Sequence, residues 1–287
     1  MIRTILAAAL FVASPLAHAQ SAVSADPLPD KAHPAKLEQL RYPTGGVAVP
    51  ARLFLAAGEG KHGTVLLLHG FPGTELNLDL ARAMQRAGWN VLAIHYRGVW
   101  GAPGKFSFAH TIEDGRAALA WLRTPDNAVK YGVDTAKIVV LGHSMGGFDT
   151  VMLGDDPKIA GFVVISAADI GGWAGFLDIP ANRPQAEAAF ADDISYTNMT
   201  FAEMADEILA NRTAWDWKTR AAKMAGRRAL IVSSDDGNGP ADSAVAAAIA
   251  AAGGPAPTQI KFETDHSYND HRIALATAVV TWLKKNF

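Results

Sequence analysis

A serine, a pair of aspartates and a histidine in this chain could together carry out nucleophilic catalysis. Ser144 lies in the segment GHSMG, with a glycine two residues away on either side. A serine hydroxyl is a weak nucleophile near neutral pH, so it needs a general base, and that base needs a carboxylate to orient it. His266 and the pair Asp235 and Asp236 can supply these two groups. We therefore predict that Ser144 attacks a carbonyl carbon and that His266 accepts its proton.

The surroundings of Ser144 make this hypothesis stronger than the short motif alone. The apolar segment Lys137–Gly142 is typical of a buried strand, and a helix is predicted to follow directly after Ser144. A serine at such a turn is held in a strained backbone conformation with its hydroxyl exposed above the sheet. Side chains in place of Gly142 and Gly146 would clash as strand and helix close on each other. The alternative is a small residue in a purely structural turn.

The proposed base and its carboxylate each follow a predicted strand. His266 comes just after Thr258–Glu263, and the aspartate pair follows Arg228–Ser233. The order serine, acid, histidine is the one that this kind of site uses. His271 begins the last predicted helix and is expected to cap it or to face solvent. Because side chains alternate along an extended segment, only one of the two aspartates should reach His266.

The reaction also needs hydrogen-bond donors for the oxyanion. The segment HGFPG follows the predicted strand Thr64–His69. Pro72 has no N–H, so we predict the backbone N–H of Phe71 as one donor and that of Met145, the residue after the serine, as the other. An ordinary strand-to-helix turn would explain the glycines of this segment, but not their coincidence with the serine turn.

Apolar strands alternate with helical segments, which predicts an α/β fold with a mostly parallel sheet and helices on both faces. A hairpin around PTGG is expected to precede this part, since two strand-like segments flank that turn signal. Thr111 and Asp114 resemble a capping box at the start of one helix. The hairpin strands are Leu37–Tyr42 and Val47–Leu55, further strands are Val91–Tyr96 and Gly161–Ala167, and the helices are Asn77–Ala87, Thr111–Arg123, Ala241–Ala252 and His271–Asn286.

Residues 170–226 interrupt the alternation and are predicted to form a helical cap insert. This connection carries the aromatic residues Trp173, Phe176, Trp215 and Trp217. A connection of this length usually has a function, such as that of an active-site lid. We expect the insert to overhang Ser144 and to supply apolar walls for the substrate. The alternative is a helical decoration that packs its aromatic residues internally.

The N-terminus predicts export. Residues 1–19 combine Arg3, an apolar segment and the sequence Ala17-His18-Ala19, which is typical of a secretory signal peptide. A membrane anchor is the alternative, but the apolar segment is shorter than the ~20 residues that span a bilayer. Residues 20–36 are expected to be a flexible lead-in, and residues 37–287 one domain. We predict a periplasmic or secreted protein, which without any cysteine is stabilised by packing alone.

The composition argues against several other classes of protein. The net charge of −2 gives no basic face for a nucleic acid, and no later segment is apolar enough to cross a membrane. No H-E-x-x-H spacing accompanies the nine histidines, and no glycine-rich nucleotide-binding motif follows a strand. We therefore expect neither a metal nor a cofactor.

Taken together, HGFPG, GHSMGG, the aspartate pair and the Asp-His dipeptide resemble the α/β-hydrolase superfamily over nearly the whole mature chain. The segment containing Tyr96-Arg97-Gly98, with Trp100 and Gly101, is similar to that of prolyl-oligopeptidase-like serine hydrolases. Only about sixty residues precede the first parallel strand in this sequence, so we do not expect the β-propeller of the oligopeptidases within it. The family pattern G-x-x-D, with Ser233 in the place of its glycine, implies that Asp236 is the acid.

The sequence thus predicts an exported serine hydrolase of α/β-hydrolase fold that cleaves a carboxylic ester through an acyl-enzyme. Alkoxide leaving groups are expelled more easily than amines, and no peptide-anchoring feature is visible. A small exopeptidase or amidase acting on short peptides is the first alternative. A non-catalytic binding protein on a hydrolase scaffold is the second.

Overall fold

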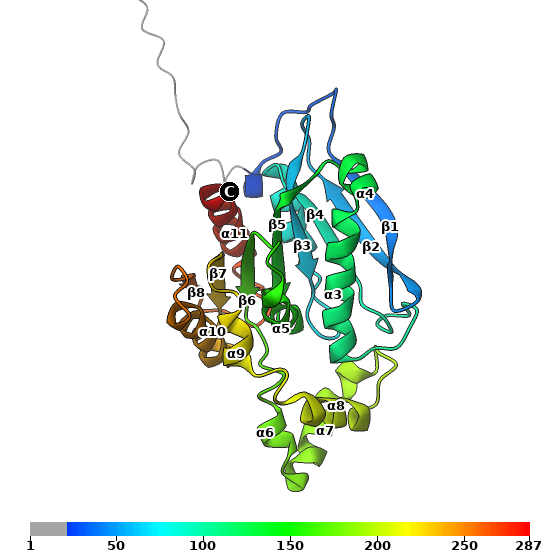
Figure 1. Ribbon diagram of the computed structural model, residues 1–287, viewed down its shortest axis with the longest axis vertical. Coiled ribbons are helices and arrows are strands. Elements are labelled where there is room, and N and C mark those ends of the chain that lie inside the picture. Colours follow the sequence, from blue (N-terminus) through cyan, green and yellow to red (C-terminus); the bar gives the residue numbers. More distant parts are fainter. Residues whose placement is uncertain (1–21) are drawn as a thin grey trace, which may run out of the picture.

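The computed structural model of the protein describes residues 22–287, so the predicted signal peptide lies outside the described residues. One sheet of eight strands forms the centre of the molecule (Figure 1). Its strands are β1 (Lys36–Thr44), β2 (Val47–Leu55), β3 (His62–Leu68), β4 (Asn90–Ile94), β5 (Val133–His143), β6 (Gly161–Ile165), β7 (Arg228–Ser233) and β8 (Thr258–Lys261).

The strand order is β1-β2-β4-β3-β5-β6-β7-β8, and the sheet is parallel from β4 to β8. Strands β1 and β2 form the predicted hairpin, in which Thr44 pairs with Val47 across a two-residue turn. Both turn residues, Gly45 and Gly46, have positive φ (51° and 78°), which is the conformation that two-residue hairpins need. From β3 onward, the strands are joined by crossovers that contain helices, as the alternation in the sequence predicts.

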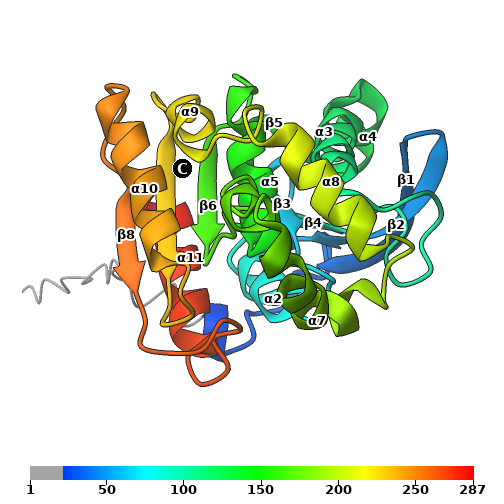
Figure 2. The same cartoon turned by 90° about the horizontal axis from the view of Figure 1, so that it is seen from below.

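Helices cover both faces of the sheet (Figures 1 and 2). They are α2 (Leu78–Arg86), α3 (Phe108–Arg123), α4 (Pro125–Lys130), α5 (Met145–Met152), α6 (Ala174–Leu177), α7 (Arg183–Ile194), α8 (Phe201–Asn211), α9 (Trp217–Ala222), α10 (Gly239–Ala251) and α11 (Arg272–Asn286), with short 3₁₀ helices η1 (Leu153–Asp155) and η2 (Pro180–Asn182). Among residues 22–287, no helix has the length and apolar character that crossing a bilayer requires.

The core is divided into two layers by the sheet. Strand side chains alternate between them, so that Leu66 and Val140 join the layer under α3, α5 and α10, whereas Val65 and Val139 join the layer under α2 and α11. All four of these side chains are fully buried. Burial on both faces explains why the central strands are continuously apolar.

One predicted helix start is wrong. Helix α3 begins at Phe108, three residues before Thr111, because the Ser107 side chain accepts a hydrogen bond from the N–H of His110 (3.1 Å) and caps the helix. The Thr111 hydroxyl instead lies inside the core and donates to Asp149 (2.7 Å). The strand expected at 258–263 ends at Lys261.

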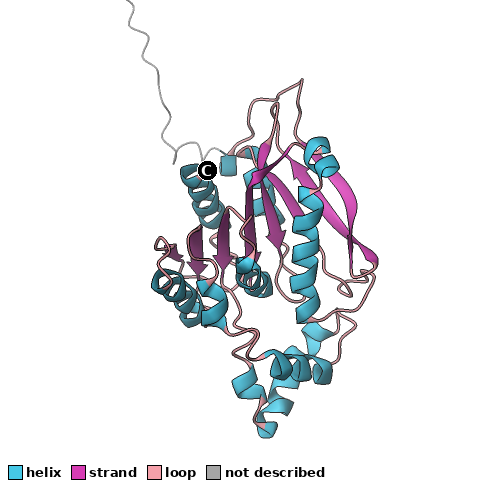
Figure 3. Ribbon diagram, viewed as in Figure 1, coloured by secondary structure: helices cyan, strands magenta, loops and turns pink. Residues whose placement is uncertain are grey.

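The connection between β6 and β7 forms helices α6 to α9. Helices α6, α7 and α8 gather beyond the ends of the central strands, away from the main helical layers (Figures 1 and 3). The carboxylate of Glu207 in α8 accepts hydrogen bonds from the N–H groups of Phe108 (2.9 Å) and Ala109 (3.0 Å) at the start of α3. A negative charge at a helix N-terminus is stabilised by the helix dipole. This contact fixes helix α8 of the insert on the main domain.

Candidate active site

Ser144 occupies a strained turn between β5 and α5. Its φ of 57° and ψ of −117° lie in a region that residues other than glycine rarely adopt. Its N–H donates to the carbonyl of Ile165 (3.0 Å), and its carbonyl accepts from the N–H groups of Phe148 and Ala168 (3.1 Å each). Such a conformation costs on the order of 1–3 kcal/mol and persists only when its surroundings impose it. These bonds to α5 and to the end of β6 impose it here.

The glycines around Ser144 are required by close backbone contacts. A Cβ on Gly142 would lie 1.8 Å from the carbonyl oxygen of Gly146, and one on Gly146 would lie 2.1 Å from that of Leu68. A Cβ on Gly70 would lie 2.9 Å from the Cβ of Ser144, so the segment HGFPG passes directly beside the serine. The predicted clash at positions 142 and 146 is therefore present in the structure.

His266 and Asp236 form a short hydrogen bond. The Nδ1 of His266 lies 2.6 Å from the Oδ2 of Asp236, whose side chain is 4 % exposed, whereas that of His266 is 40 % exposed. Burial raises the pKa of Asp236, but hydrogen bonds from His266 and from the N–H of Asn238 (2.8 Å) outweigh it and hold this pKa below its usual range. The carboxylate is therefore ionised at neutral pH and can orient the imidazole.

The two alternative residues lie elsewhere. Asp235 is half exposed and forms an ion pair with Lys261 (2.7 Å). His271 precedes the first residue of α11, and its Nδ1 lies 2.8 Å from the carboxylate of its neighbour Asp270. Of the two predicted acids, the structure thus places Asp236 against the imidazole of His266. Both aspartates lie in a bend after the end of β7 at Ser233, so the structure separates their contacts through the bend and not through strand alternation.

His143, the residue before the serine, holds the loop that carries His266. Its Nε2 lies 2.8 Å from the carbonyl oxygen of His266, and the two rings are 4.7 Å apart. Burial lowers the pKa of His143 to about 3, so the ring is neutral and donates through Nε2. The sequence gives no signal for this role because the two residues are 123 positions apart.

The predicted oxyanion donors lie on the two segments that meet at Ser144. Met145 is the first residue of α5, where backbone N–H groups have no partner within the helix. The N–H of Phe71 shares a planar peptide with the carbonyl of Gly70, so the two groups point in opposite directions. That carbonyl accepts from Nδ1 of His69 (2.7 Å). Burial lowers the pKa of His69 to about 4, so its ring is neutral and its Nδ1–H fixes the direction of the Phe71 N–H.

Aromatic side chains connect this segment to the insert. The ring of Phe71 stacks on Phe106 (5.4 Å) and contacts Phe190 in α7 (6.4 Å), which in turn packs on Trp173 (5.2 Å). Phe176 does not take part and is 44 % exposed. Insert residues thus form part of the apolar surroundings of Phe71.

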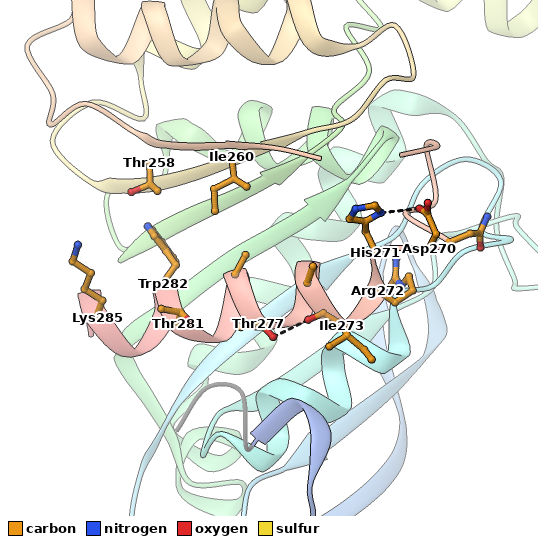
Figure 4. A pocket seen from close by; sticks show the side chains of 13 residues that line it. Thr258, Ile260, Asp270, His271, Arg272, Ile273, Thr277, Thr281, Trp282 and Lys285 are labelled. Atoms are coloured by element: carbon orange, nitrogen blue, oxygen red, sulfur yellow. Dashed lines mark hydrogen bonds and ion pairs between the residues drawn. The ribbon is translucent and has the colours of Figure 1, made fainter. Parts of the chain in front are cut away.

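A cavity of about 630 Å³ lies between the insert and the loop that carries Asp236. Trp173, Trp215 and Trp217 line it from the insert, and Gly237 and Asn238 line it from the loop. A second cavity, of about 870 Å³, lies between β8 and α11 and is lined by residues including Ile260, Ile273 and Trp282 (Figure 4). Ser144 and His266 line neither of these two cavities.

Comparison with known proteins agrees with this architecture. Residues 65–278 match the model of the alpha/beta hydrolase family. Two uncharacterized proteins of Mycobacterium tuberculosis are each 31 % identical over 126 residues, which is 43 % of this chain and 43 % of theirs. The chain thus matches less than half the length of these relatives.

Solved structures with the same fold include both esterases and peptidases. The esterase of Pyrobaculum calidifontis has a TM-score of 0.65 at 18 % identity, with 88 % of this chain and 87 % of that chain covered. A structure described as a putative dipeptidyl aminopeptidase IV from Bacteroides ovatus has a TM-score of 0.66 at 16 % identity, with 88 % of this chain but 36 % of that chain covered. The fold resemblance to both groups is therefore confirmed.

The protein belongs to the alpha/beta hydrolase family, because the family model spans most of its length. Ser144 lies at the strand-to-helix turn where this fold carries its nucleophile.

Proposed function

We propose that this protein is an exported serine hydrolase that cleaves a carboxylic ester by an acyl-enzyme mechanism. The observation that carries the proposal is the strained backbone of Ser144 at the turn between β5 and α5. In the same chain, the imidazole of His266 forms a hydrogen bond with the buried carboxylate of Asp236. A serine, a histidine and a carboxylate form a catalytic triad, in which the histidine and the carboxylate activate the serine. His266 and Asp236 lie in loops that follow strands of the same parallel sheet, and ligands of such folds bind at these ends of the strands.

The first half of the reaction forms the acyl-enzyme. The Oγ of Ser144 attacks the ester carbonyl carbon while Nε2 of His266 takes the hydroxyl proton. The carbonyl oxygen becomes an oxyanion, which accepts hydrogen bonds from the N–H groups of Phe71 and Met145. As the tetrahedral intermediate collapses, the bond to the leaving alkoxide breaks and His266 gives its proton to that oxygen. Asp236 stabilises the imidazolium that exists between these two transfers.

The second half releases the acid. A water molecule attacks the acyl carbon of the ester at Ser144, and Nε2 of His266 takes one of its protons. A second oxyanion forms in the same position and is bound by the same two N–H groups. Its collapse breaks the bond to Oγ, and His266 returns the proton to the serine. The carboxylic acid leaves, and the free enzyme is regenerated.

An ester is favoured over an amide because an alkoxide is expelled more easily than an amine. A small exopeptidase or amidase is the second candidate, since peptidases are among the proteins that share the fold. The apolar wall of Phe71, Phe190 and Trp173 favours an apolar acyl or alcohol group in the substrate.

The test is a matched pair of substrates, a p-nitrophenyl ester and a p-nitroanilide with the same acyl group, measured across several acyl chain lengths. We expect turnover of the ester by the wild-type protein and none by Ser144→Ala. Preferential turnover of the anilide would identify an amidase, and binding of both without turnover would identify a non-catalytic binding protein. Export is tested separately by expression of the full chain, where we expect the mature protein to begin after Ala19.

A further inference from the structure

Trp100 occupies an unusual position between the insert and the HGFPG segment. It has a φ of 51°, in the left-handed region, although it is not a glycine, and its side chain is half exposed. A bulky residue in this conformation is a genuine outlier. The surrounding contacts must therefore impose it, and they come from two directions.

The first contact is with the segment that carries Phe71. The indole Nε1–H of Trp100 donates to the carbonyl oxygen of Pro72, the residue directly after Phe71, over 3.0 Å. The segment also passes between Trp100 and His69. A Cβ on Gly73 would lie 2.8 Å from the His69 ring and 3.2 Å from the Trp100 indole. A second hydrogen bond, from Nδ1 of His69, holds the carbonyl of Gly70, so the carbonyls of the residues before and after Phe71 both have donors.

The second contact is with the insert. The rings of Trp100 and Tyr196 stack with centroids 4.3 Å apart and planes at 27°. The N–H of Trp100 donates to the carbonyl of Tyr196 (2.9 Å), and Val99 pairs with Thr197 as an antiparallel bridge. The backbone and the ring of Trp100 are thus both fixed on the chain between α7 and α8.

We propose that Trp100 is a positioning residue that couples the seating of the insert to the direction of the Phe71 N–H. Resting on the proposed function, this means that oxyanion stabilisation depends on contact between Trp100 and Tyr196. Without the contact with Tyr196, the indole loses its support and the carbonyl of Pro72 loses its donor. The oxyanion site is then complete only when the insert is in place.

The test compares variants that break each side of this link. Trp100→Phe keeps a ring against Tyr196 but removes the N–H, and Tyr196→Ala keeps the N–H but removes the stacked ring. Phe176→Ala is the matched control, because this insert aromatic has the same 44 % exposure as Tyr196 but lies outside the stacked pair. For each variant, kcat and KM for the ester are measured separately, together with the thermal midpoint.

Loss of a direct oxyanion donor costs about 10²–10³ in kcat. Because Trp100 acts through the backbone, we expect about a 10-fold loss in kcat for Trp100→Phe and about 5-fold for Tyr196→Ala, with KM changed less than 2-fold. In the double variant, the losses should be less than multiplicative, since both act through one link. Phe176→Ala should match the wild type.

Unchanged kcat in both variants, with only a lower thermal midpoint, would reduce Trp100 to a structural role and overturn the proposal. The same holds if KM rises while kcat stays constant, because that pattern reports lost substrate binding. Failure of the proposed function has a different signature, since the wild-type protein itself would then show no ester turnover.

Discussion

Replacing Asp236 with asparagine should nearly abolish ester turnover while leaving the fold intact. Asparagine has almost the same shape and can still accept the hydrogen bond from the N–H of Asn238 (2.8 Å). It differs in charge, and its amide can present an N–H₂ group to the Nδ1 of His266, which lies 2.6 Å from the carboxylate in the wild type. That contact would favour the tautomer with the proton on Nε2, which cannot accept the proton of Ser144.

The size of the effect follows from burial. The Asp236 side chain is 4 % exposed, so little water is available to replace the carboxylate as a partner for the imidazolium. In a serine protease with the same arrangement, this substitution lowers kcat about 10⁴-fold. A 10⁴-fold loss corresponds to about 5 kcal/mol of transition-state stabilisation. We expect a loss approaching this value in kcat for an activated ester, with an unchanged far-UV circular dichroism spectrum.

Asp235→Asn is the matched control one residue earlier. Its ion pair with Lys261 is exposed, since the two side chains are 49 % and 61 % accessible. An exposed pair contributes about 0–1 kcal/mol to stability. We therefore expect turnover within about twofold of the wild type. A larger loss for Asp235→Asn than for Asp236→Asn would refute the assignment of the acid.

Three further predictions concern packing, pH and the insert. Gly142→Ala places a Cβ 1.8 Å from a backbone oxygen and should lower the thermal midpoint sharply. Gly175→Ala is the control, because a Cβ there meets no atom within 4 Å and the midpoint should not change. Equal midpoints for the two variants would contradict the packing argument. Burial raises the pKa of Asp149 to about 8, so the folded state holds a proton that the unfolded state releases near pH 4, and stability should be lost as the pH rises from about 4 to about 8. Asp149→Asn should flatten this slope in denaturant titrations at pH 5 and pH 8, and an unchanged slope would show that Asp149 is not its source. Trp173→Ala should alter the preference between short and long acyl esters, because Trp173 packs against Phe190 in the aromatic wall. Phe176→Ala should not alter this preference, because the Phe176 side chain is exposed. The reverse result would place the substrate on another face of the insert.

The parts of the site that the sequence reveals are those set by local structure. The turn at Ser144 is predictable because a buried strand, two glycines and a helix are contiguous. The clash at Gly142 is local, with the carbonyl of Gly146, whereas that at Gly146 is with the carbonyl of Leu68 in β3. The hairpin at Gly45 and Gly46 is also predictable from contiguous residues. The preference for Asp236 over Asp235 comes from the pattern of a known family, since both residues lie in a bend beyond the end of β7.

Other parts depend on contacts that no local pattern encodes. His143 reaches a carbonyl 123 residues later, and Glu207 reaches α3 from 99 residues away. The start of α3 was mistaken because Thr111 and Asp114 have the residue types of a cap, whereas the structure turns both into the core, where Asp114 accepts from Thr44 and Arg97. Trp100 belongs to a segment that the family resemblance singles out, but its link to Tyr196 exists only once the insert is folded.

The most direct test of the central claim is covalent labelling of the mature protein with a fluorophosphonate, followed by peptide mass mapping. The reagent forms a stable phosphonyl bond with an activated serine, so it reports the nucleophile without any assumption about the natural substrate. We predict a single adduct on Ser144, with complete loss of labelling in Ser144→Ala and retention in Asp235→Asn. An adduct on another residue, or labelling that persists in Ser144→Ala, would contradict the mechanism.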